Sequence, residues 1–271
     1  MTCLHCNKEN PQGSFYCKYC GEKHLLKCKK CQAHLDVDNV FCNMCGTKVE
    51  NEFISVTNAT NPKFFKIRDG VLERYTGKGI KTVILPSGIT KIGKKAFQEC
   101  DAKEIHLSQG ITHIGEEAFI ESRGLEKISF PEGLSVIGEC AFFLCTSLTK
   151  VQLPSSVIKI DTAAFSFCRK LREINLPSRL EHLGSHVFKS SESLVELIIP
   201  TGITTLEEGV ISGCTALTKM VIPSTVTLIE ESGEEGSLGI FHTCHNLTIY
   251  GEPDSVAETI AKEEQVPFEL V

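Results

Sequence analysis

The chain has 271 residues, of which 41% are hydrophobic and 23% are charged, and its formal net charge is −6. This composition is ordinary for a globular protein with one large core or two domains. The first 50 residues carry a charge of +2, which leaves −8 for the rest. Neither part has the basic excess that binding to phosphates requires, so the composition argues against nucleic acid as a partner.

The first residues contain neither the basic nor the apolar segment of a secretory signal, and no apolar run reaches membrane-spanning length. We therefore expect a cytoplasmic protein without membrane contact. In that reducing compartment, the 14 cysteines predict metal ligands or buried thiols and argue against a disulfide framework.

Eight cysteines form four Cys-x-x-Cys pairs near the N-terminus. They are Cys3, Cys6, Cys17, Cys20, Cys28, Cys31, Cys42 and Cys45. Adding 25 to the residue number maps the first two pairs onto the last two and Gly21 onto Gly46, so residues 1–48 contain a duplicated unit. Each Cys-x-x-Cys turn directs two thiolates to one point, and two such turns complete a tetrahedral metal site.

This arrangement predicts two structural Zn²⁺ ions, one for each four-cysteine unit. A unit of about 20 residues buries too little apolar surface to fold alone, so metal binding has to supply the folding free energy, about 10–16 kcal/mol for zinc in small peptides. Four protein ligands leave no position for water or substrate. Because a copied unit must already close on itself, we expect neighbouring pairs to share an ion. An interleaved pairing, iron in the same thiolate sites and disulfides are the alternatives.

Residues 3–46 resemble the double zinc ribbon family, with all eight cysteines and the glycines that follow, Gly21 and Gly46, in place. The resemblance implies an adaptor role more often than catalysis.

Residues 49–63 lack a sustained hydrophobic period and contain several Asn, Thr and Ser residues, which predicts a linker. Residues 64–79 place Asp69-Gly70 between alternating apolar residues, which predicts a β-hairpin. Such a hairpin would cover the open end of the repeats that follow, since a terminal repeat otherwise exposes its core.

Residues 80–250 form seven repeats of about 23 residues. A proline marks the register at Pro131, Pro154, Pro177, Pro200 and Pro223. An aromatic position contains Phe97, Phe119, Phe142, Phe165, Phe188, Ile211 and Phe241, and three residues later the chain has Cys100, Ser122, Cys145, Cys168, Ser191, Cys214 and Cys244. We interpret this Cys or Ser as a small buried filler and not as a thiol or metal ladder.

Each repeat predicts a short strand before the proline, a turn, a second short strand and a helical turn on the outer face. No repeat can bury its apolar face alone, so neighbours stack and their strands form a parallel ladder about 33 Å long. The pattern resembles the BspA-like leucine-rich repeats, whose unit is Leu-x-x-Leu-x-Leu-Pro followed by Ile-Gly-x-x-Ala-Phe and Cys. The resemblance covers residues 64–271 and implies a β-rich leucine-rich-repeat solenoid. Because many relatives are bacterial surface proteins, an adhesion-type protein at the bacterial cell surface is the alternative to a cytoplasmic scaffold.

The last repeat has seven extra residues, an acidic stretch at 230–236 that we interpret as a solvated insertion, with a specificity loop as the alternative. Residues 251–271 predict a C-terminal cap. Ser255 and Glu258 form a capping box that opens a helix to about Gln265, and Pro267-Phe268 closes the stack.

Outward strand positions predict the functional face. Ion pairs between neighbouring strands are expected for Glu104/Lys127, Lys150/Glu173 and Glu196/Lys219. Exposed Ile198 and Val221, beside Glu196 and Lys219, predict a small apolar patch for a protein partner.

The sequence contains no Cys, His and Asp residues at the spacing of a known nucleophilic catalytic motif, and it contains no Gly-rich phosphate-binding loop. We therefore predict a monomeric, non-enzymatic protein–protein interaction module or scaffold. A nucleic-acid-binding adaptor acting through the zinc ribbons and a redox carrier with thiolate iron are the rival hypotheses.

Overall fold

The computed structural model describes residues 8–9, 26–27, 34–35, 61–230, 240–241 and 243–271. The chain divides into two compact units, Met1–Asn61 and Pro62–Val271. In the first unit, the described residues include strands β1 (Leu26–Lys27) and β2 (His34–Leu35), which pair antiparallel. The eight N-terminal cysteines and most of the predicted linker and acidic insertion lie outside the described residues.

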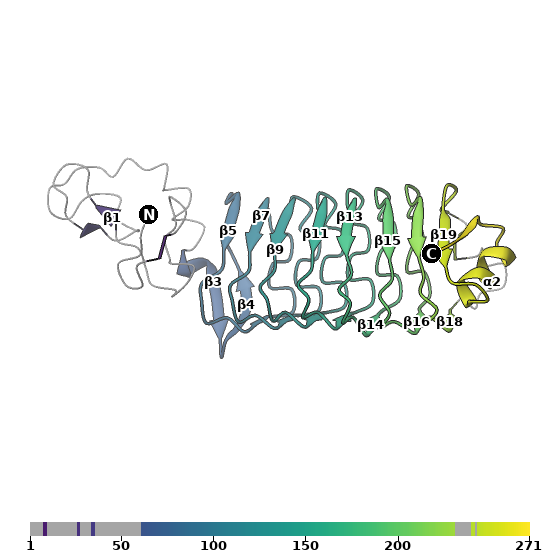
Figure 1. Cartoon of the computed structure of the whole chain (residues 1–271). Helices are drawn as coiled ribbons and strands as arrows, with labels where there is room; N and C mark the ends of the chain where they lie inside the picture. Colours follow the sequence, from purple (N-terminus) through teal and green to yellow (C-terminus); the bar gives the residue numbers. More distant parts are fainter. Residues whose placement is uncertain (1–7, 10–25, 28–33, 36–60, 231–239, 242) are drawn as a thin grey trace. The chain divides into compact units, whose positions relative to one another are not determined.

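The second unit is a β-solenoid, and each coil contributes strands to two separate edges (Figure 1). The first edge consists of β5 (Thr82–Ile84), β7 (Glu104–His106), β9 (Lys127–Ser129), β11 (Lys150–Gln152), β13 (Glu173–Asn175), β15 (Glu196–Ile198), β17 (Lys219–Val221) and β19 (Thr248–Gly251). These strands pair in parallel as β5-β7-β9, β11-β13 and β15-β17-β19. The predicted parallel ladder is confirmed, and β19, at the end of the last repeat, is its eighth strand.

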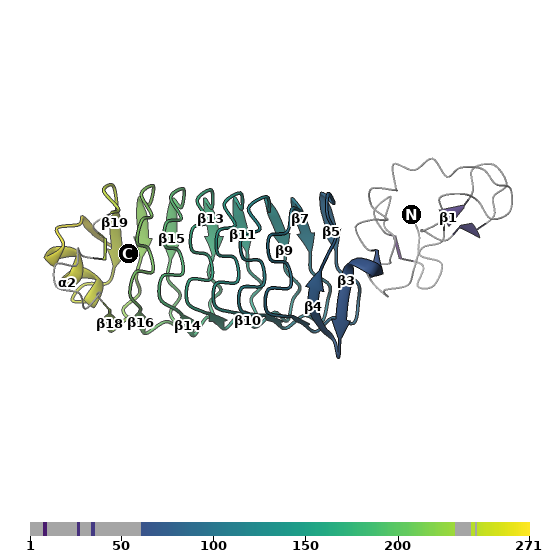
Figure 2. The same cartoon turned by 180° about the vertical axis from the view of Figure 1, so that it is seen from behind.

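The second edge consists of shorter strands, seen from behind in Figure 2. They are β6 (Lys91–Ile92), β8 (His113–Ile114), β10 (Val136–Ile137), β12 (Lys159–Ile160), β14 (His182–Leu183), β16 (Thr205–Leu206) and β18 (Leu228–Ile229). A glycine often follows, because neighbouring backbones approach closely there. A Cβ atom at Gly115 would lie 2.8 Å from the Ile92 carbonyl oxygen, and one at Gly184 would lie 2.6 Å from the Thr162 nitrogen.

In the described coils, the segment that closes each coil consists of consecutive tight turns. It does not form the helical turn that the repeat pattern predicted. Every fourth residue there adopts a positive φ, such as 57° at Lys95 and 51° at Glu99. Residues in the left-handed backbone conformation interrupt the hydrogen-bond pattern of an α-helix. The N–H of Phe97 instead donates to the carbonyl oxygen of Ala118 in the next coil, at 2.7 Å. The turns thus form a third hydrogen-bonded ladder between coils.

A column of stacked aromatic rings occupies the core. The rings of Phe97, Phe119, Phe142, Phe165 and Phe188 follow one another with centroids 4.9, 4.8, 5.1 and 6.2 Å apart. All five side chains are buried, as are Ile211 and Phe241 further along. Tyr75 extends the column at its N-terminal end, 5.0 Å from Phe97. The predicted buried position is therefore confirmed, and Tyr75 is an additional member that the repeat pattern did not include.

The N-terminal end of the solenoid begins with the 3-10 helix η2 (Pro62–Phe64) and an antiparallel hairpin of β3 (Phe65–Arg68) and β4 (Val71–Tyr75). Asp69 and Gly70 have φ values of 50° and 75°, which a tight two-residue hairpin turn requires. The predicted hairpin is confirmed, and β4 pairs in parallel with β6.

The C-terminal end contains the helix α2 (Val256–Glu263). The Ser255 hydroxyl oxygen accepts a hydrogen bond from the Glu258 N–H at 3.3 Å, so the predicted N-cap is confirmed, although the helix ends two residues before Gln265. The expected closing residue Phe268 lies in strand β20 (Phe268–Leu270), which pairs in parallel with β19. Among the described residues, no helix has the length and apolar character needed to cross a membrane.

Candidate functional site

The predicted zinc ligands all lie outside the described residues, so the fit to zinc is tested by their donor chemistry. Four thiolates for each duplicated unit are the soft, negatively charged ligands that Zn²⁺ prefers in a closed tetrahedral site. In the part of the chain that the structure describes, no group of three or more His, Cys, Asp and Glu side chains is arranged to hold a metal ion.

The four residues predicted to bind a partner lie on the adjacent strands β15 and β17. Glu196 is in register with Lys219, and Ile198 is in register with Val221. The Lys219 Nζ atom lies 2.7 Å from Glu196 Oε1, and this hydrogen bond raises the pKa of Lys219. Ile198 is 53% exposed and Val221 is partly exposed. The geometry thus places an apolar pair directly beside an ion pair.

Tyr250 on β19 extends this surface and is not among the residues predicted to bind a partner. Tyr250 is in register with Val221, and the Lys219 Nζ atom lies 5.5 Å from the centroid of its ring. A hydrogen bond with Glu269 raises the pKa of the Tyr250 hydroxyl. The segment Leu-Thr-Ile-Tyr after Cys244 repeats the strand pattern and could have revealed it. We call Ile198, Val221 and Tyr250 the apolar row.

The other predicted ion pairs have mixed outcomes. Lys150 and Glu173 form theirs, with Nζ and Oε2 2.5 Å apart. The pair of Glu104 with Lys127 is wrong, because Glu104 Oε1 lies 3.3 Å from the Nε2 atom of His106, which faces the same side of β7. These side chains are exposed, so each ion pair stabilises the fold by only about 0–1 kcal/mol.

The Cys or Ser that follows each core aromatic residue is more than a filler. Ser122 Oγ donates a hydrogen bond to the Phe97 carbonyl oxygen at 2.8 Å, and Cys168 Sγ donates to that of Phe142 at 3.3 Å. Burial raises the pKa of Cys100 and Cys244 to about 11 and that of the more deeply buried thiols Cys145, Cys168 and Cys214 as well. Protonated, buried thiols are poor nucleophiles and poor metal ligands.

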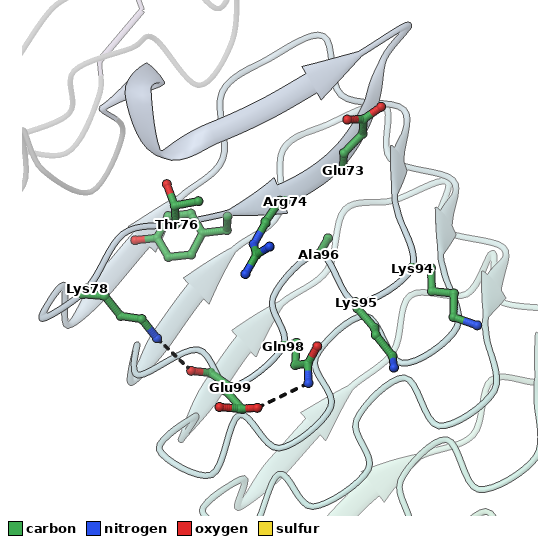
Figure 3. A pocket seen from close by; sticks show the side chains of 10 residues that line it. Glu73, Arg74, Thr76, Lys78, Lys94, Lys95, Ala96, Gln98 and Glu99 are labelled. Carbon is green, nitrogen blue, oxygen red and sulfur yellow. Dashed lines mark hydrogen bonds between the residues drawn. The ribbon is translucent and has the colours of Figure 1, made fainter.

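A cavity of about 750 Å³ lies beside β4, and its lining includes four cations (Figure 3). Lys94 and Lys95 are each neutralised by a glutamate of the next coil, at 2.6 Å and 2.9 Å. Lys78 donates a hydrogen bond to the carbonyl oxygen of Glu99 at 3.3 Å. Figure 3 shows the remaining cation, Arg74, with the lysines spread around the cavity and not converging on one point. Three of the four cations of this cavity are therefore already engaged by glutamates or a backbone carbonyl.

A second cavity of about 400 Å³ lies along the N-terminal ends of the first-edge strands from β11 to β17. Its lining consists of Thr149, Lys170, Arg172, Glu192, Ser193, Val195 and Ala216. We call it the Arg172 groove.

Comparisons with known proteins agree with both parts of the chain. A family model for the BspA type leucine rich repeat region matches in six copies over residues 71–154 and 112–248, and a double zinc ribbon model matches residues 3–46. No curated protein matches the chain.

Two solved structures are similar to the solenoid. A leucine-rich repeat protein from T. pallidum is 28% identical with a TM-score of 0.63, and the match covers 76% of this chain and 96% of that one. A leucine-rich repeat protein from Bacteroides ovatus is 27% identical with a TM-score of 0.60, and the match covers 76% of this chain and 54% of that one.

Proposed function

The chain belongs to the BspA-type leucine-rich repeat family and carries a double zinc ribbon, and from this membership we propose that it is a non-enzymatic module that binds another protein. The observation that carries the proposal is the apolar row. Ile198, Val221 and Tyr250 follow one another on three hydrogen-bonded strands of one exposed sheet face.

The apolar row has the properties of an interface centre. Tyr250 offers a large apolar ring with a polar end, and tyrosine is enriched among residues that dominate binding energy. Lys219, held between Glu196 and the Tyr250 ring, supplies a polar border. Because the strands are fixed by backbone hydrogen bonds, a partner would bind this surface without a large loss of conformational entropy.

In this proposal the zinc ribbons serve as an adaptor unit. One Zn²⁺ ion would be held by Cys3, Cys6, Cys17 and Cys20, and the other by Cys28, Cys31, Cys42 and Cys45. Bound zinc would supply the folding free energy of this small unit. Sites closed by four thiolates leave no position for a substrate, which supports a structural role.

The proposed module is a monomer in the cytoplasm. Thiolate zinc sites require reduced cysteines, which that compartment maintains. Detection of the native protein on intact, unpermeabilised cells would contradict this location and favour the adhesion-type alternative. The net charge of −6 supports a protein partner over nucleic acid.

The binding function is tested by co-purifying partners from the source cells, identifying them by mass spectrometry and reconstituting the complex from purified proteins. Ile198→Glu places a charge in the centre of the apolar row, and we expect it to weaken binding by about tenfold or more, because a desolvated charge without a partner opposes association. Leu228→Glu is the matched control, since Leu228 is 51% exposed on the other strand edge. Equal affinity of the wild-type protein and Ile198→Glu would remove the apolar row as the binding surface.

A further inference from the structure

The Arg172 groove combines an apolar surface with two cationic side chains. Val195, which is 41% exposed, and Ala216 form its apolar part. Lys170 and Arg172 supply the charge, and within the described part of the chain neither forms an ion pair. The one carboxylate of the lining, Glu192, lies 3.4 Å from the Nε atom of Arg169 and is therefore already paired.

Arg172 lies in a column of residues at equivalent positions of successive coils. The position just before each first-edge strand contains Lys81, Lys103, Glu126, Thr149, Arg172, Val195, Thr218 and Leu247 in successive coils. Lys103 Nζ lies 2.5 Å from Glu126 Oε1 of the next coil. Arg172 has Thr149 on one side of this column and Val195 on the other. Arg172 thus has no acid on either side of it in this column, although it interacts electrostatically with Glu173 of its own coil, and it lies beside the exposed side chain of Val195.

We propose that the Arg172 groove binds a carboxylate-bearing segment of the protein partner, with the carboxylate against Arg172 and Lys170 and a short apolar side chain on Val195 and Ala216. The proposal rests on the protein-binding function proposed above and names the chemistry of the bound segment. A guanidinium group binds a carboxylate through two parallel hydrogen bonds. The cavity volume is within the range of about 300–1,000 Å³ that is usual for ligand pockets.

The groove is continuous with the apolar row along one strand. Val195 immediately precedes β15, and Ile198 is the last residue of that strand. A segment that places its carboxylate in the groove can therefore continue across β15 toward Val221. Nucleic acid fits this surface less well, because the groove lining supplies only two cations and the chain carries a net charge of −6.

The test uses the full-length zinc-loaded chain and a display library of random short peptides. We expect selected peptides to contain Asp or Glu close to a small apolar residue. A synthetic selected peptide should bind at least about tenfold more weakly to Arg172→Glu, the factor associated with a lost hydrogen bond to a charged group. Replacing its acidic residue by the corresponding amide should have a similar effect. Arg179→Glu is the control, because Arg179 is an exposed arginine of the same repeat, removed from the groove lining, and the variant should bind like the wild-type protein.

Four results would overturn the proposal: no enriched peptide, enrichment without acidic residues, equal weakening by Arg172→Glu and Arg179→Glu, or displacement of the peptide by a single-stranded oligonucleotide at physiological salt. Equal weakening would show that net charge alone controls binding. These results concern the groove, whereas the Ile198→Glu measurement on the natural complex tests the binding function separately.

Discussion

The Glu264 carboxylate accepts a hydrogen bond of 2.9 Å from the backbone N–H of Phe241. In earlier coils, the same N–H of the core aromatic residue donates to a backbone carbonyl of the next coil. The described C-terminal segment continues as α2 and β20 instead of another coil, and Glu264 supplies the acceptor. Its second oxygen accepts a hydrogen bond from the Ile240 N–H at 2.8 Å. A side chain of the C-terminal cap thus ends the third hydrogen-bonded ladder.

Glu264→Ala leaves two N–H groups without acceptors, and we expect it to lower the free energy of unfolding of the last coil by about 2 kcal/mol. The measurement is hydrogen exchange of the backbone amides of Ile240 and Phe241, which should become faster. Glu263→Ala is the control, since Glu263 is the exposed last residue of α2 and directly precedes Glu264. Unchanged exchange in Glu264→Ala would show that the carboxylate does not close the ladder.

Phe142→Ala removes a buried ring from the middle of the aromatic column and should lower the free energy of unfolding by about 3–5 kcal/mol. Phe142→Leu should cost less, because Ile211 shows that an aliphatic side chain occupies the equivalent position. Phe143→Ala is the neighbouring control, since the Phe143 side chain is only partly buried and makes an edge contact with Phe167. Urea denaturation followed by near-ultraviolet circular dichroism gives the three values. Similar losses for Phe142→Ala and Phe143→Ala would contradict the importance of the column.

The buried thiols predict a loss of stability at alkaline pH. Burial raises the pKa of Cys100 and Cys244 from 9.0 to about 11 in the folded chain. Between these values the unfolded chain releases a proton that the folded chain retains, so the free energy of unfolding falls as pH rises from 9 to 11. Each thiol contributes roughly 2–3 kcal/mol to this fall. Denaturation at a series of pH values should show a smaller decrease for Cys244→Ser, and an identical decrease would contradict the assignment.

Removal of zinc should affect the first unit and leave the solenoid folded, because the buried core found among the described residues is made by residues of the second unit. We expect release of about two zinc ions per chain by a chelator and a thiol-blocking reagent, from a colourless protein. Cys17→Ser should abolish one ion and retain the other, because each cysteine is a ligand of only one of the two ions. Loss of both ions, or visible absorption from iron, would contradict the proposed sites.

The repeat period predicted the strands and the core because one residue pattern recurs coil after coil. Val83, Ile105, Val151 and their equivalents are buried since each lies at the centre of a short strand in the same register. Tyr75 lies in a hairpin that lacks the repeat pattern, although it is 22 residues before Phe97, the same spacing as from Phe97 to Phe119. Its place in the aromatic column follows from β4 pairing with β6.

Other features depend on contacts that leave no periodic signal. Glu104 has a histidine on its own strand and a lysine on the next, and only the geometry decides between them. Glu264 is one of several glutamates in the cap, and its role depends on where α2 ends. The Arg172 groove is lined by residues from several coils, which are far apart in the sequence. It can be recognised only when the equivalent positions of neighbouring coils are compared.

The three ladders of hydrogen bonds all run along the solenoid axis, and this determines how the second unit should respond to mechanical force. Pulling the two ends of the second unit apart places the force along the hydrogen bonds between coils. The coils should therefore detach one at a time, each at low force. Each coil of about 23 residues would release about 80 Å of extended chain. In the proposed binding function, the solenoid would then serve as an extensible tether between the zinc-ribbon unit and the protein partner.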